Sequence, residues 1–597
     1  MSTSLLRVIW SVTGPYKKYA VFLLILLIVS AVFDSLSLVM ILPVLEVLLN
    51  HENSRYYRLM QPVLSWFPSS SHLFVVCGLC FLLIVFKNIL VLYRAWVSKS
   101  FIGKLRLYWS SHIFDNCLYS HFIWYLKQKQ GVILENVLYE PNYASKCFRD
   151  LIDLVNMAFI VLCLTASLLF LNWQVTVLTF VVGLFICLVQ WRYTSKHSSS
   201  IGKEKILLNQ GISGMVAESI AGVRQVKLFA MEKSVARIFH GRMERLMQLL
   251  VRLGVIQELP NAIGEVAIVG LILSILLYYI YELGVPFSEI VPFIGMFVIA
   301  ANRLSMNLGK LLSQRVSVLS FMPSLQLVDD LVHHADIRES SRPGGAIPPF
   351  HDCVVFENVD FQYDKSHPVF QSLDLEFKQG KVTALTGPSG SGKSTVCDLL
   401  TGLLRPSSGR ILVDGRDMEG IDIRGWRDRL GYVSQESFFF NATLRENILS
   451  GMPSVGDDDL VRIASLCGAH EFVRDFPGGY DTVIGDSGIR MSVGQRQRIA
   501  VMRALVRRPQ ILILDEVTSS LDSQNEKEIL QLIDRLRAEG MTVILVTHRI
   551  LTLRVTDFIY VMEKGRVVES GAYEDLLRNQ NLFSRLDQLS REPVVSS

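Results

Sequence analysis

The sequence lacks any spacing of cysteines that would indicate a metal centre or a set of disulfide bonds. Its nine cysteines are scattered over 597 residues, and Cys77 and Cys80 stand inside an apolar stretch. We interpret them as small apolar residues and exclude a zinc site and a disulfide framework. An excess of charge of one sign is also missing. The net charge is +4, and no pattern of basic and aromatic residues indicates a nucleic-acid partner.

Apolar runs, by contrast, are abundant. Hydrophobic residues make up 50% of the chain and the mean hydropathy is +0.35, which is too apolar for an ordinary soluble protein of this length. A membrane-spanning helix needs roughly 20 apolar residues. We therefore expect six spans rather than six buried helices of a soluble core. They are residues 19–49, 72–97, 151–171, 174–191, 263–283 and 287–304.

Basic residues indicate which side of the membrane each connection faces. The segments 98–150 and 192–262 carry many lysines and arginines, whereas the connections 172–173 and 284–286 carry none. Because cytoplasmic loops collect positive charge, we expect both termini in the cytosol. The first span is too long for a cleavable signal peptide and lacks a small-residue cleavage site, so we expect it to remain in the protein.

A glycine-rich run carries the clearest chemical signal. It lies between an expected strand at 382–385 and an expected helix at 394–403, which is the setting that a phosphate-binding loop needs. The glycines let backbone N–H groups surround a polyphosphate, Lys393 would reach its β- and γ-phosphates, and Ser394 would hold Mg²⁺. The residues of the run are Gly387, Pro388, Ser389, Gly390, Ser391, Gly392, Lys393, Ser394 and Thr395.

Two further expected strands end in polar side chains. The apolar residues 511–514 lead into Asp515 and Glu516, and the β-branched run 542–547 ends at His548. We expect Asp515 to hold Mg²⁺, Glu516 to orient the attacking water and His548 to contact the γ-phosphate. The alternative is a buried strand with acids at its solvent end and a structural histidine.

In this order the residues resemble the ATP-binding-cassette (ABC) family over nearly the whole C-terminal portion. The resemblance implies that Tyr363 stacks on adenine, and that Gln435 contacts magnesium and signals to the membrane part. The other nucleotide-site residues that it implies are Ser492, Gly494 and Gln495 of the family signature, residues 491–495, and Asp522 of the dimer-contact loop, residues 519–522.

The signature departs from the family in two places. Met491 replaces leucine, which is an apolar exchange, and Val493 replaces glycine, which adds a side chain where backbone approaches a phosphate. We expect function to survive because Ser492 and Gly494 are present. In the family the signature heads a helix that faces a γ-phosphate bound by the opposite subunit. The resemblance therefore implies a dimer, either a homodimer with two competent sites or a heterodimer.

The layout of spans followed by one cassette resembles an exporter half-transporter. We expect a membrane α-helical domain of six transmembrane helices, the ABC exporter fold, followed by an α/β P-loop nucleotide-binding domain with an antiparallel β-subdomain and a helical subdomain. Alternation at 354–363 and 369–377 predicts two strands of that β-subdomain. The expected boundaries are 1–325 for the transmembrane domain, 326–350 for a linker, 351–590 for the nucleotide-binding domain and 591–597 for a tail.

Charged residues inside spans are expensive and usually face a partner or an aqueous cavity. Asp34 and Lys87 both lie about 21–22 Å below the outer ends of their spans at ~1.5 Å per residue. We expect an ion pair between them or a shared polar cavity; the alternative is a pair that only locks two helices together. With Arg94 and Arg303, Lys87 would give a cavity a positive charge that favours an anionic head group.

The expected function is ATP-driven export or flipping of an amphipathic substrate across the cytoplasmic membrane, with ATP and Mg²⁺ as cofactors. A lipid, a glycolipid or a lipid-linked oligosaccharide or polysaccharide precursor is favoured, because span one and residues 301–304 are similar to bacterial flippases for lipid-linked oligosaccharides. Drugs or peptides are the alternative, although no peptidase domain precedes the first span. Intact hydrolytic residues argue against an ATP-gated channel, and six spans argue against a soluble ATPase acting on DNA or ribosomes.

Overall fold

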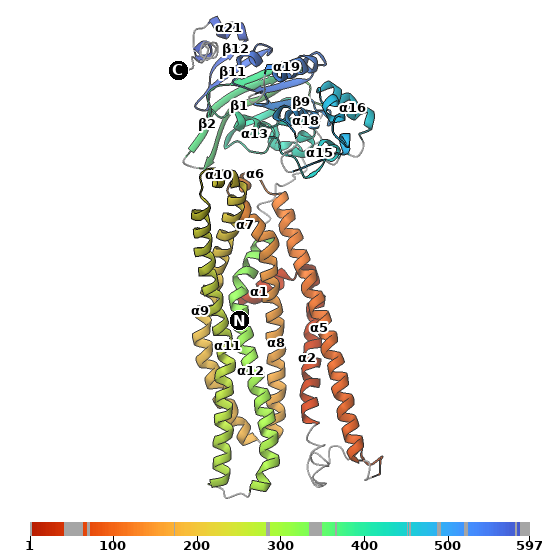
Figure 1. The fold of residues 1–597 in the computed structure, drawn as a ribbon, viewed down its shortest axis with the longest axis vertical. Helices are drawn as coiled ribbons and strands as arrows, with labels where there is room; N and C mark the ends of the chain where they lie inside the picture. The colour runs from red at the N-terminus through yellow and green to blue at the C-terminus, as the bar shows by residue number, and fades with distance from the viewer. Residues whose placement is uncertain are drawn as a thin grey trace. The chain divides into compact units, whose positions relative to one another are not determined.

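The chain divides into two units, which are described separately (Figure 1). The first contains Met1–Ser120 and Lys127–Arg338, and the second contains His121–Leu126 and Glu339–Ser597. The computed structural model describes residues 3–40, 62, 64–68, 72–171, 173–281, 287–333, 349–364, 367–449, 452, 455–485, 491–518, 523–578 and 582–585.

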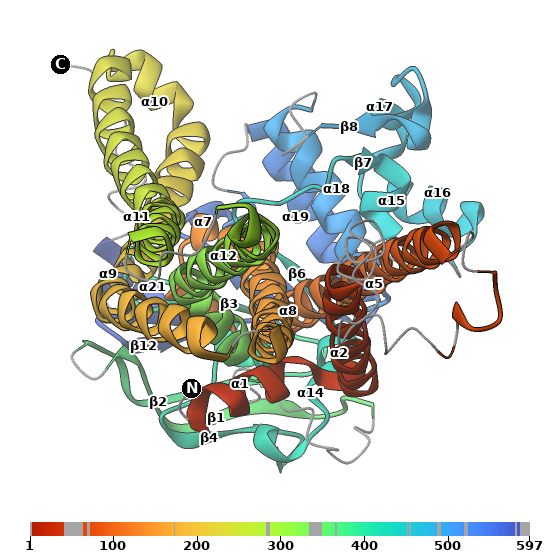
Figure 2. The ribbon, with the colours of Figure 1, turned by 90° about the horizontal axis from the view of Figure 1, so that it is seen from below.

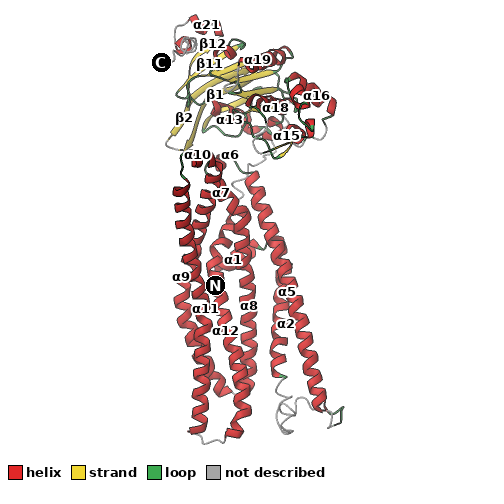
Figure 3. Cartoon of the chain, in the orientation of Figure 1, coloured by secondary structure: helices red, strands yellow, loops and turns green. Residues whose placement is uncertain are grey.

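The first unit is helical, and its described residues contain no strand (Figure 3). Two of its segments, Gly14–Ser37 and His72–Leu118, are long and apolar enough to cross a membrane, judged over the described residues. Residues 41–49 of the first expected span lie outside the described residues. The elements are α1 (Thr3–Val12), η1 (Gly14–Tyr16), α2 (Lys17–Val39), α5 (His72–Leu118), α7 (Gln130–Leu134), the π-helical turn η3 (Glu135–Tyr139), α8 (Glu140–Leu171), α9 (Trp173–Ala221), α10 (Val223–Leu228), α11 (Glu232–Tyr281) and α12 (Phe287–His333).

The long helices pack around a central pair. Seen along their axes, α8 and α12 lie in the middle of this unit, with α2 and α5 on one side and α9 and α11 on the other (Figure 2). Helix α9 approaches α12 so closely that a Cβ on Gly202 would lie 2.2 Å from the carbonyl oxygen of Ser320. Large apolar side chains point outward from α2 and α5, such as Ile25, 54% exposed, and Phe81, 66% exposed. Such a surface suits a hydrocarbon surrounding rather than water.

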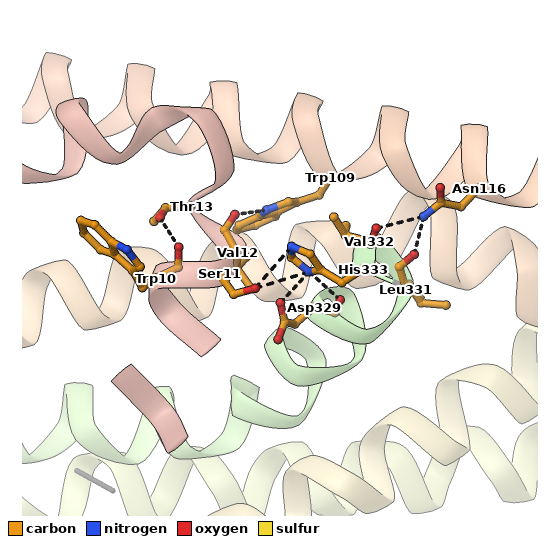
Figure 4. Close-up of polar contacts among 10 residues, drawn as sticks. All are labelled: Trp10, Ser11, Val12, Thr13, Trp109, Asn116, Asp329, Leu331, Val332 and His333. Carbon is orange, nitrogen blue, oxygen red and sulfur yellow. Dashed lines mark hydrogen bonds and ion pairs between the residues drawn. The ribbon is translucent and has the colours of Figure 1, made fainter. Parts of the chain in front are cut away.

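The first helix is attached to two of the long helices (Figure 4). The indole Nε1 of Trp109 on α5 donates a hydrogen bond to the carbonyl oxygen of Val12 over 2.9 Å. Ser11 Oγ lies 3.3 Å from Nε2 of His333, the last residue of α12, and Nδ1 of His333 lies 2.9 Å from the carboxylate of Asp329. The start of the chain is therefore fixed to the end of α12.

The second unit contains both described main sheets (Figure 3). One has six strands in the order β12-β11-β3-β10-β9-β6, and the other has four in the order β2-β1-β4-β5. The elements are α6 (Phe122–Leu126), β1 (Cys353–Asp364), β2 (His367–Lys378), β3 (Val382–Thr386), α13 (Lys393–Leu400), β4 (Ser408–Val413), β5 (Arg416–Asp417), η5 (Met418–Gly420), α14 (Ile423–Arg427), β6 (Leu430–Val433), β7 (Ala442–Thr443), α15 (Leu444–Leu449), α16 (Asp457–Leu466), α17 (His470–Arg474), η6 (Gly479–Asp481), β8 (Val483–Ile484), α18 (Val493–Leu505), β9 (Ile511–Asp515), α19 (Ser523–Ala538), β10 (Thr542–Val546), α20 (Ile550–Leu553), β11 (Phe558–Glu563), β12 (Arg566–Gly571) and α21 (Tyr573–Arg578).

Burial of the strands explains how the six-stranded sheet forms. Every residue of β3, β9 and β10 is buried, as expected for β-branched and leucine-rich strands covered on both faces. β10 pairs in parallel with β3 and β9, and β9 pairs in parallel with β6. The carboxyl ends of these four strands therefore lie along one edge of the sheet. The strands expected at 354–363 and 369–377 are confirmed as β1 and β2, which pair antiparallel.

Candidate functional site

The glycine-rich loop between β3 and α13 requires glycine at specific positions. Gly387, Gly390 and Gly392 have φ angles of +139°, +79° and +101°, a region that L side chains disfavour. A Cβ on Gly387 would lie 2.0 Å from the carbonyl oxygen of Met562, and one on Gly392 would lie 2.4 Å from the ring of Phe370. The loop amides and the N-terminus of α13 thus form a set of donors suited to an anion.

Lys393 at the start of α13 folds back over this loop. Its Nζ donates to the carbonyl oxygens of Gly387 and Pro388 over 2.9 and 2.8 Å, and it lies 3.4 Å from Ser391 Oγ. Burial lowers the pKa of Lys393, and the carboxylates of Glu516 and Asp515 act in the opposite direction. A buried ammonium held by loop carbonyls can turn its donors toward a phosphate that enters the same loop.

Asp515 and Glu516 follow each other at the end of β9 but face different surroundings. Asp515 is only 6% exposed and accepts a hydrogen bond from Tyr432 Oη over 3.1 Å. Burial raises the pKa of Asp515, and hydrogen bonds from Tyr432 and Ser394 lower it in part. Glu516 has a left-handed backbone with φ of +51°, and its N–H donates to the carbonyl oxygen of Val546 over 2.9 Å. This backbone turn directs the two carboxylates differently.

The carboxylate of Glu516 joins three elements. Gln435 Nε2 donates to its Oε2 over 2.7 Å, and His548 Nδ1 lies 3.8 Å from its Oε1. Gln435 follows β6 and His548 follows β10, so the sheet order that places β9 between these strands also brings the three side chains together. Such an edge at the carboxyl ends of parallel strands is where α/β sheets bind ligands.

Four other predicted residues lie on β1, in the glycine-rich loop and at the start of α13. Tyr363 Oη on β1 lies 3.2 Å from Thr395 Oγ1 on α13. Ser394 on the same helix is exposed, as is Ser389 in the loop. The hydroxyl of Ser394 and the carboxylate of Asp515 lie within hydrogen-bond reach, and such oxygen donors match the preference of Mg²⁺. The amide oxygen of Gln435 is the third donor of the predicted set.

The signature residues cap helix α18. The hydroxyl of Ser492 accepts from the N–H of Gln495 over 3.2 Å, and the side chain of Gln495 accepts from the N–H of Ser492 over 2.9 Å. These two hydrogen bonds form a capping box. Within the first turn of the helix, Gly494 is buried and Val493 is 42% exposed. The substituted valine therefore points away from the core of its own subunit. Asp522 lies outside the described residues.

Three of the charged side chains predicted inside the spans, Asp34, Lys87 and Arg94, have polar contacts with neighbouring helices. Lys87 Nζ on α5 lies 2.5 Å from the carboxylate of Asp34 on α2, which confirms the expected ion pair. Arg94 Nη1 donates to Ser30 Oγ on α2 over 3.1 Å and to Asn156 Oδ1 on α8 over 2.7 Å. These contacts form a polar path over three helices. Arg303 belongs to α12, but its side chain lies outside the described residues.

Two features of the second unit were not predicted from the sequence. The hydrogen bond from Tyr432 to Asp515 depends on the pairing of β6 with β9, which no local pattern specifies. Helix α6 precedes α7 in the chain yet belongs to the second unit, where Phe122 and Ile123 pack against the core formed by residues such as Phe361 and Leu399. Its apolar run was the only available signal.

Comparisons with known proteins agree with this arrangement. A family model of the ABC transporter transmembrane region matches residues 20–317, and a family model described as ABC transporter matches residues 370–519. The chain is 28% identical over 583 residues to the ATP-dependent lipid A-core flippase of Syntrophus aciditrophicus (strain SB), covering 96% of this chain and 92% of that protein. It is 42% identical over 246 residues to the leukotoxin translocation ATP-binding protein LktB of Pasteurella haemolytica-like sp. (strain 5943B), covering 41% of this chain and 35% of that protein.

A solved structure shares the fold. It is a bacterial Atm1-family ABC exporter with ATP bound, which superposes with a TM-score of 0.78 at 22% identity and covers 97% of this chain and 100% of that chain. The fold class expected from the sequence is therefore confirmed.

Proposed function

The chain belongs to the ABC transporter family and is an integral membrane ATPase coupled to transport, and from this premise we propose that a dimer of it flips or exports an anionic amphipathic lipid. The single observation that supports the ATPase part best is the meeting of Lys393, Asp515, Glu516 and Gln435 at one sheet edge. The observation that supports the choice of cargo is the polar path of Lys87 and Arg94 between apolar helices.

We assign the steps of hydrolysis to residues of this edge. The loop amides and Lys393 bind the phosphates, Tyr363 packs on the base, and Glu516 holds the attacking water with His548 beside it. Ser394, Asp515 and Gln435 would hold Mg²⁺, which neutralises charge on the phosphates when it is bound. Gln435 donates its Nε2–H to Glu516, so its Oε1 would be the atom that serves the metal, and one amide would connect the metal with the carboxylate that holds the water.

The second half of each nucleotide site comes from another copy of the chain. Ser492 and Gln495 satisfy each other in the described subunit, and Ser492 heads a 13-residue helix whose N-terminus attracts anions. A γ-phosphate arriving from a second copy can take the place of the intrahelical partner. A homodimer is the simplest assembly with two complete sites, and closure of these sites drives the first unit between its two access states.

The cargo is assigned from the charges of the first unit. Lys87 and Arg94 are cations held in an apolar environment, where a phosphate or pyrophosphate head group gains more than it does in water. Asp34 neutralises Lys87 in the described conformation, and an anionic lipid would compete with it. Arg303 is the third cation of the proposed cavity. The lipid A-core flippase among the relatives supports a lipid cargo, and the leukotoxin relative keeps peptides and other amphiphiles as the alternative.

The topology is part of the same proposal. Both termini and the nucleotide site lie in the cytosol of the cell, and the helices of the first unit cross the cytoplasmic membrane. This orientation gives the ATPase access to ATP and exposes the cavity first to lipids made on the inner side.

The test uses purified full-length protein in proteoliposomes. ATPase activity is measured against an anionic polyprenyl-linked glycan, a neutral glycolipid and a cationic amphiphile. The proposal expects stimulation and ATP-dependent flipping by the anionic lipid alone, and loss of that stimulation in Arg94→Met. Stimulation by the neutral or cationic amphiphile alone would contradict the proposed flipping of an anionic lipid and would favour multidrug export.

A further inference from the structure

A second buried group of ionisable side chains lies where η3 and the start of α8 pack against α9 and α12. Glu135 and Glu140 are 3% and 0% exposed, and Lys205 on α9 is 8% exposed. These residues lie outside the expected spans 151–171 and 174–191, on the extensions of the same helices. Neither the nucleotide site nor the polar path of Lys87 and Arg94 includes any of these residues.

Glu140 differs from its neighbours in what it contacts. Neither of its carboxylate oxygens makes a hydrogen bond of ordinary geometry with the described part of the chain. Glu135, by contrast, accepts a hydrogen bond from Ser213 Oγ over 2.7 Å. Lys205 forms no ion pair with either acid in the described part of the chain, and its ammonium lies 4.2 Å from the ring centroids of both Tyr143 and Phe321. The cation is therefore held by aromatic faces and not by a carboxylate.

Described residues on η3, α9 and α12 change the pKa of Glu140. Burial raises its pKa and is the largest effect; a hydrogen bond from Ser324 on α12 and the charge of Lys205 on α9 lower the pKa, and the charge of Glu135 on η3 raises it further. Burial also lowers the pKa of Lys205 to about 8, with Lys146 acting in the same direction. A carboxylate that loses its hydration and has no well-aligned hydrogen bond in return is less stable than the neutral acid.

We propose that Glu140 is a proton-binding site, and that the conformation described here is the one in which the proton is bound. The site sits beside a π-helical turn, where the regular ladder of α-helical hydrogen bonds is interrupted, and such turns are frequent at functional positions. It also lies at a junction of three helices whose packing has to change in alternating access.

Lys205 provides the means of releasing the proton. A movement of α9 relative to α8 that takes its ammonium from Tyr143 to Glu140 creates an ion pair, which favours the carboxylate and expels the proton. This release rests on the proposed transport cycle, whereas proton binding by the described conformation does not. The two parts can therefore fail separately.

Proton binding is tested by the pH dependence of unfolding in purified full-length protein, with Glu140→Gln as a neutral isostere. An acid with a raised pKa costs the folded protein stability as pH rises from the value at which an ordinary glutamate titrates, about 4.3. The glutamine does not titrate. We expect the unfolding midpoint of Glu140→Gln to exceed that of the parent by an amount that grows between pH 5 and 8 to on the order of 2 °C or more.

A matched control separates this effect from the removal of any glutamate. Glu218→Gln changes an exposed acid on α9 that pairs with Lys129 over 3.1 Å, and its midpoint should follow that of the parent at every pH. A Glu140→Gln variant that is less stable than the parent at pH 8, or that fails to fold, would show that the carboxylate is ionised and has a partner. A constant difference across the pH range would equally overturn the proposal.

Proton release is tested by the pH profile of ATP hydrolysis in the same preparations. The parent should lose activity at alkaline pH, where the site empties; Glu140→Gln, which neither binds nor releases a proton, should lack this limb and hydrolyse ATP more slowly than the parent. Lys205→Met removes a cation that lowers the pKa of Glu140, so its limb should move to higher pH. If all three profiles coincide while the unfolding result holds, the proton is structural and the coupling to the cycle is wrong. If no variant hydrolyses ATP, the proposed function fails and proton binding stands on the unfolding data.

Discussion

The two units hold their charged side chains in different ways. In the second unit, Asp515 and Glu516 lie on a turn at the end of a buried strand. Their side chains can contact a ligand there without a movement of the backbone. In the first unit, Asp34 and Lys87 stand within long helices and neutralise each other over 2.5 Å. Loops at a sheet edge can present charge, whereas helices among apolar surfaces have to compensate it internally. Any ligand in the first unit must therefore compete with an existing pair.

The largest expected effect is at the nucleotide site of the second unit. Glu516→Gln keeps the shape of the side chain and its contact with Gln435 but cannot activate water. We expect ATP hydrolysis to fall by roughly 10²–10⁴-fold while ATP still binds. Hydrolysis rates and equilibrium ATP binding check this in parallel. The exposed Glu419→Gln on η5 is the control, and hydrolysis at the parental rate in Glu516→Gln would remove its assignment.

Breaking the compensated pair should be nearly as damaging, but to folding. Lys87→Met removes the cation that lies 2.5 Å from the carboxylate of Asp34 among apolar helices, at a cost of up to about 3–5 kcal/mol. Thermal unfolding and yield of the detergent-extracted protein measure this loss. The double variant Asp34→Asn with Lys87→Met should recover most of the stability.

The same double variant sharpens the question of the cargo. If Lys87 serves only to lock α2 to α5, the recovered protein will be stimulated by anionic lipid as the parent is. We expect it to fold and to hydrolyse ATP without that stimulation. Stimulation equal to that of the parent would show that the Asp34–Lys87 pair has only a structural role.

A smaller effect is expected from the backbone of the glycine-rich loop. Gly387→Ala places a Cβ 2.0 Å from the carbonyl oxygen of Met562, so the loop or β11 has to move, at about 3 kcal/mol. Gly390→Ala is the matched control: its φ of +79° is also unfavourable, but no atom lies within 4 Å of the added Cβ, so about 1–2 kcal/mol is expected. Thermal unfolding of the two variants with and without ATP measures the difference. Equal losses of stability in the two variants would mean that backbone strain, and not the close contact with Met562, is the reason that glycine is required at position 387.

The smallest effect concerns an acid next to this site. Burial raises the pKa of Asp398 to about 6, and Asp515 adds to the shift. Because the folded value is raised, the parent loses stability as pH increases from about 4 to 6 and stays at the lower level above that range. Asp398→Asn should therefore be more stable than the parent by about 1–3 kcal/mol at pH 7 and equal to it near pH 4. A higher stability of the parent at pH 7 would contradict this sign.

The sequence predicted the second unit well because its site residues follow strands directly. The expected strand at 382–385 is β3, one residue longer, and the acids and His548 come at strand ends as predicted. The helix expected at 394–403 was wrong at its end. It stops at Leu400, and Gly402 with φ of +67° lies just beyond, in a backbone conformation that does not continue a helix.

The first unit was predictable only along its helix axes. Counting residues from the ends of two spans placed Asp34 and Lys87 at one level, and the ion pair followed. The partners of Arg94 and the isolation of Glu140 depend on which faces of three helices meet, and no single apolar stretch contains that information. The roles of Arg303 and Asp522 stay predictions, since neither side chain is among those described.

The central claim is that each nucleotide lies between the glycine-rich loop of one subunit and the signature of its partner. Dimers of two differently tagged chains in a Glu516→Gln background test it through the number of ATP molecules occluded per dimer. When one chain carries Lys393→Ala and the other carries Ser492→Arg, one loop and one signature remain intact on opposite chains, and we predict one occluded ATP. When one chain carries both changes, we predict none. The reverse result, with ATP occluded only when both changes share a chain, would contradict the account.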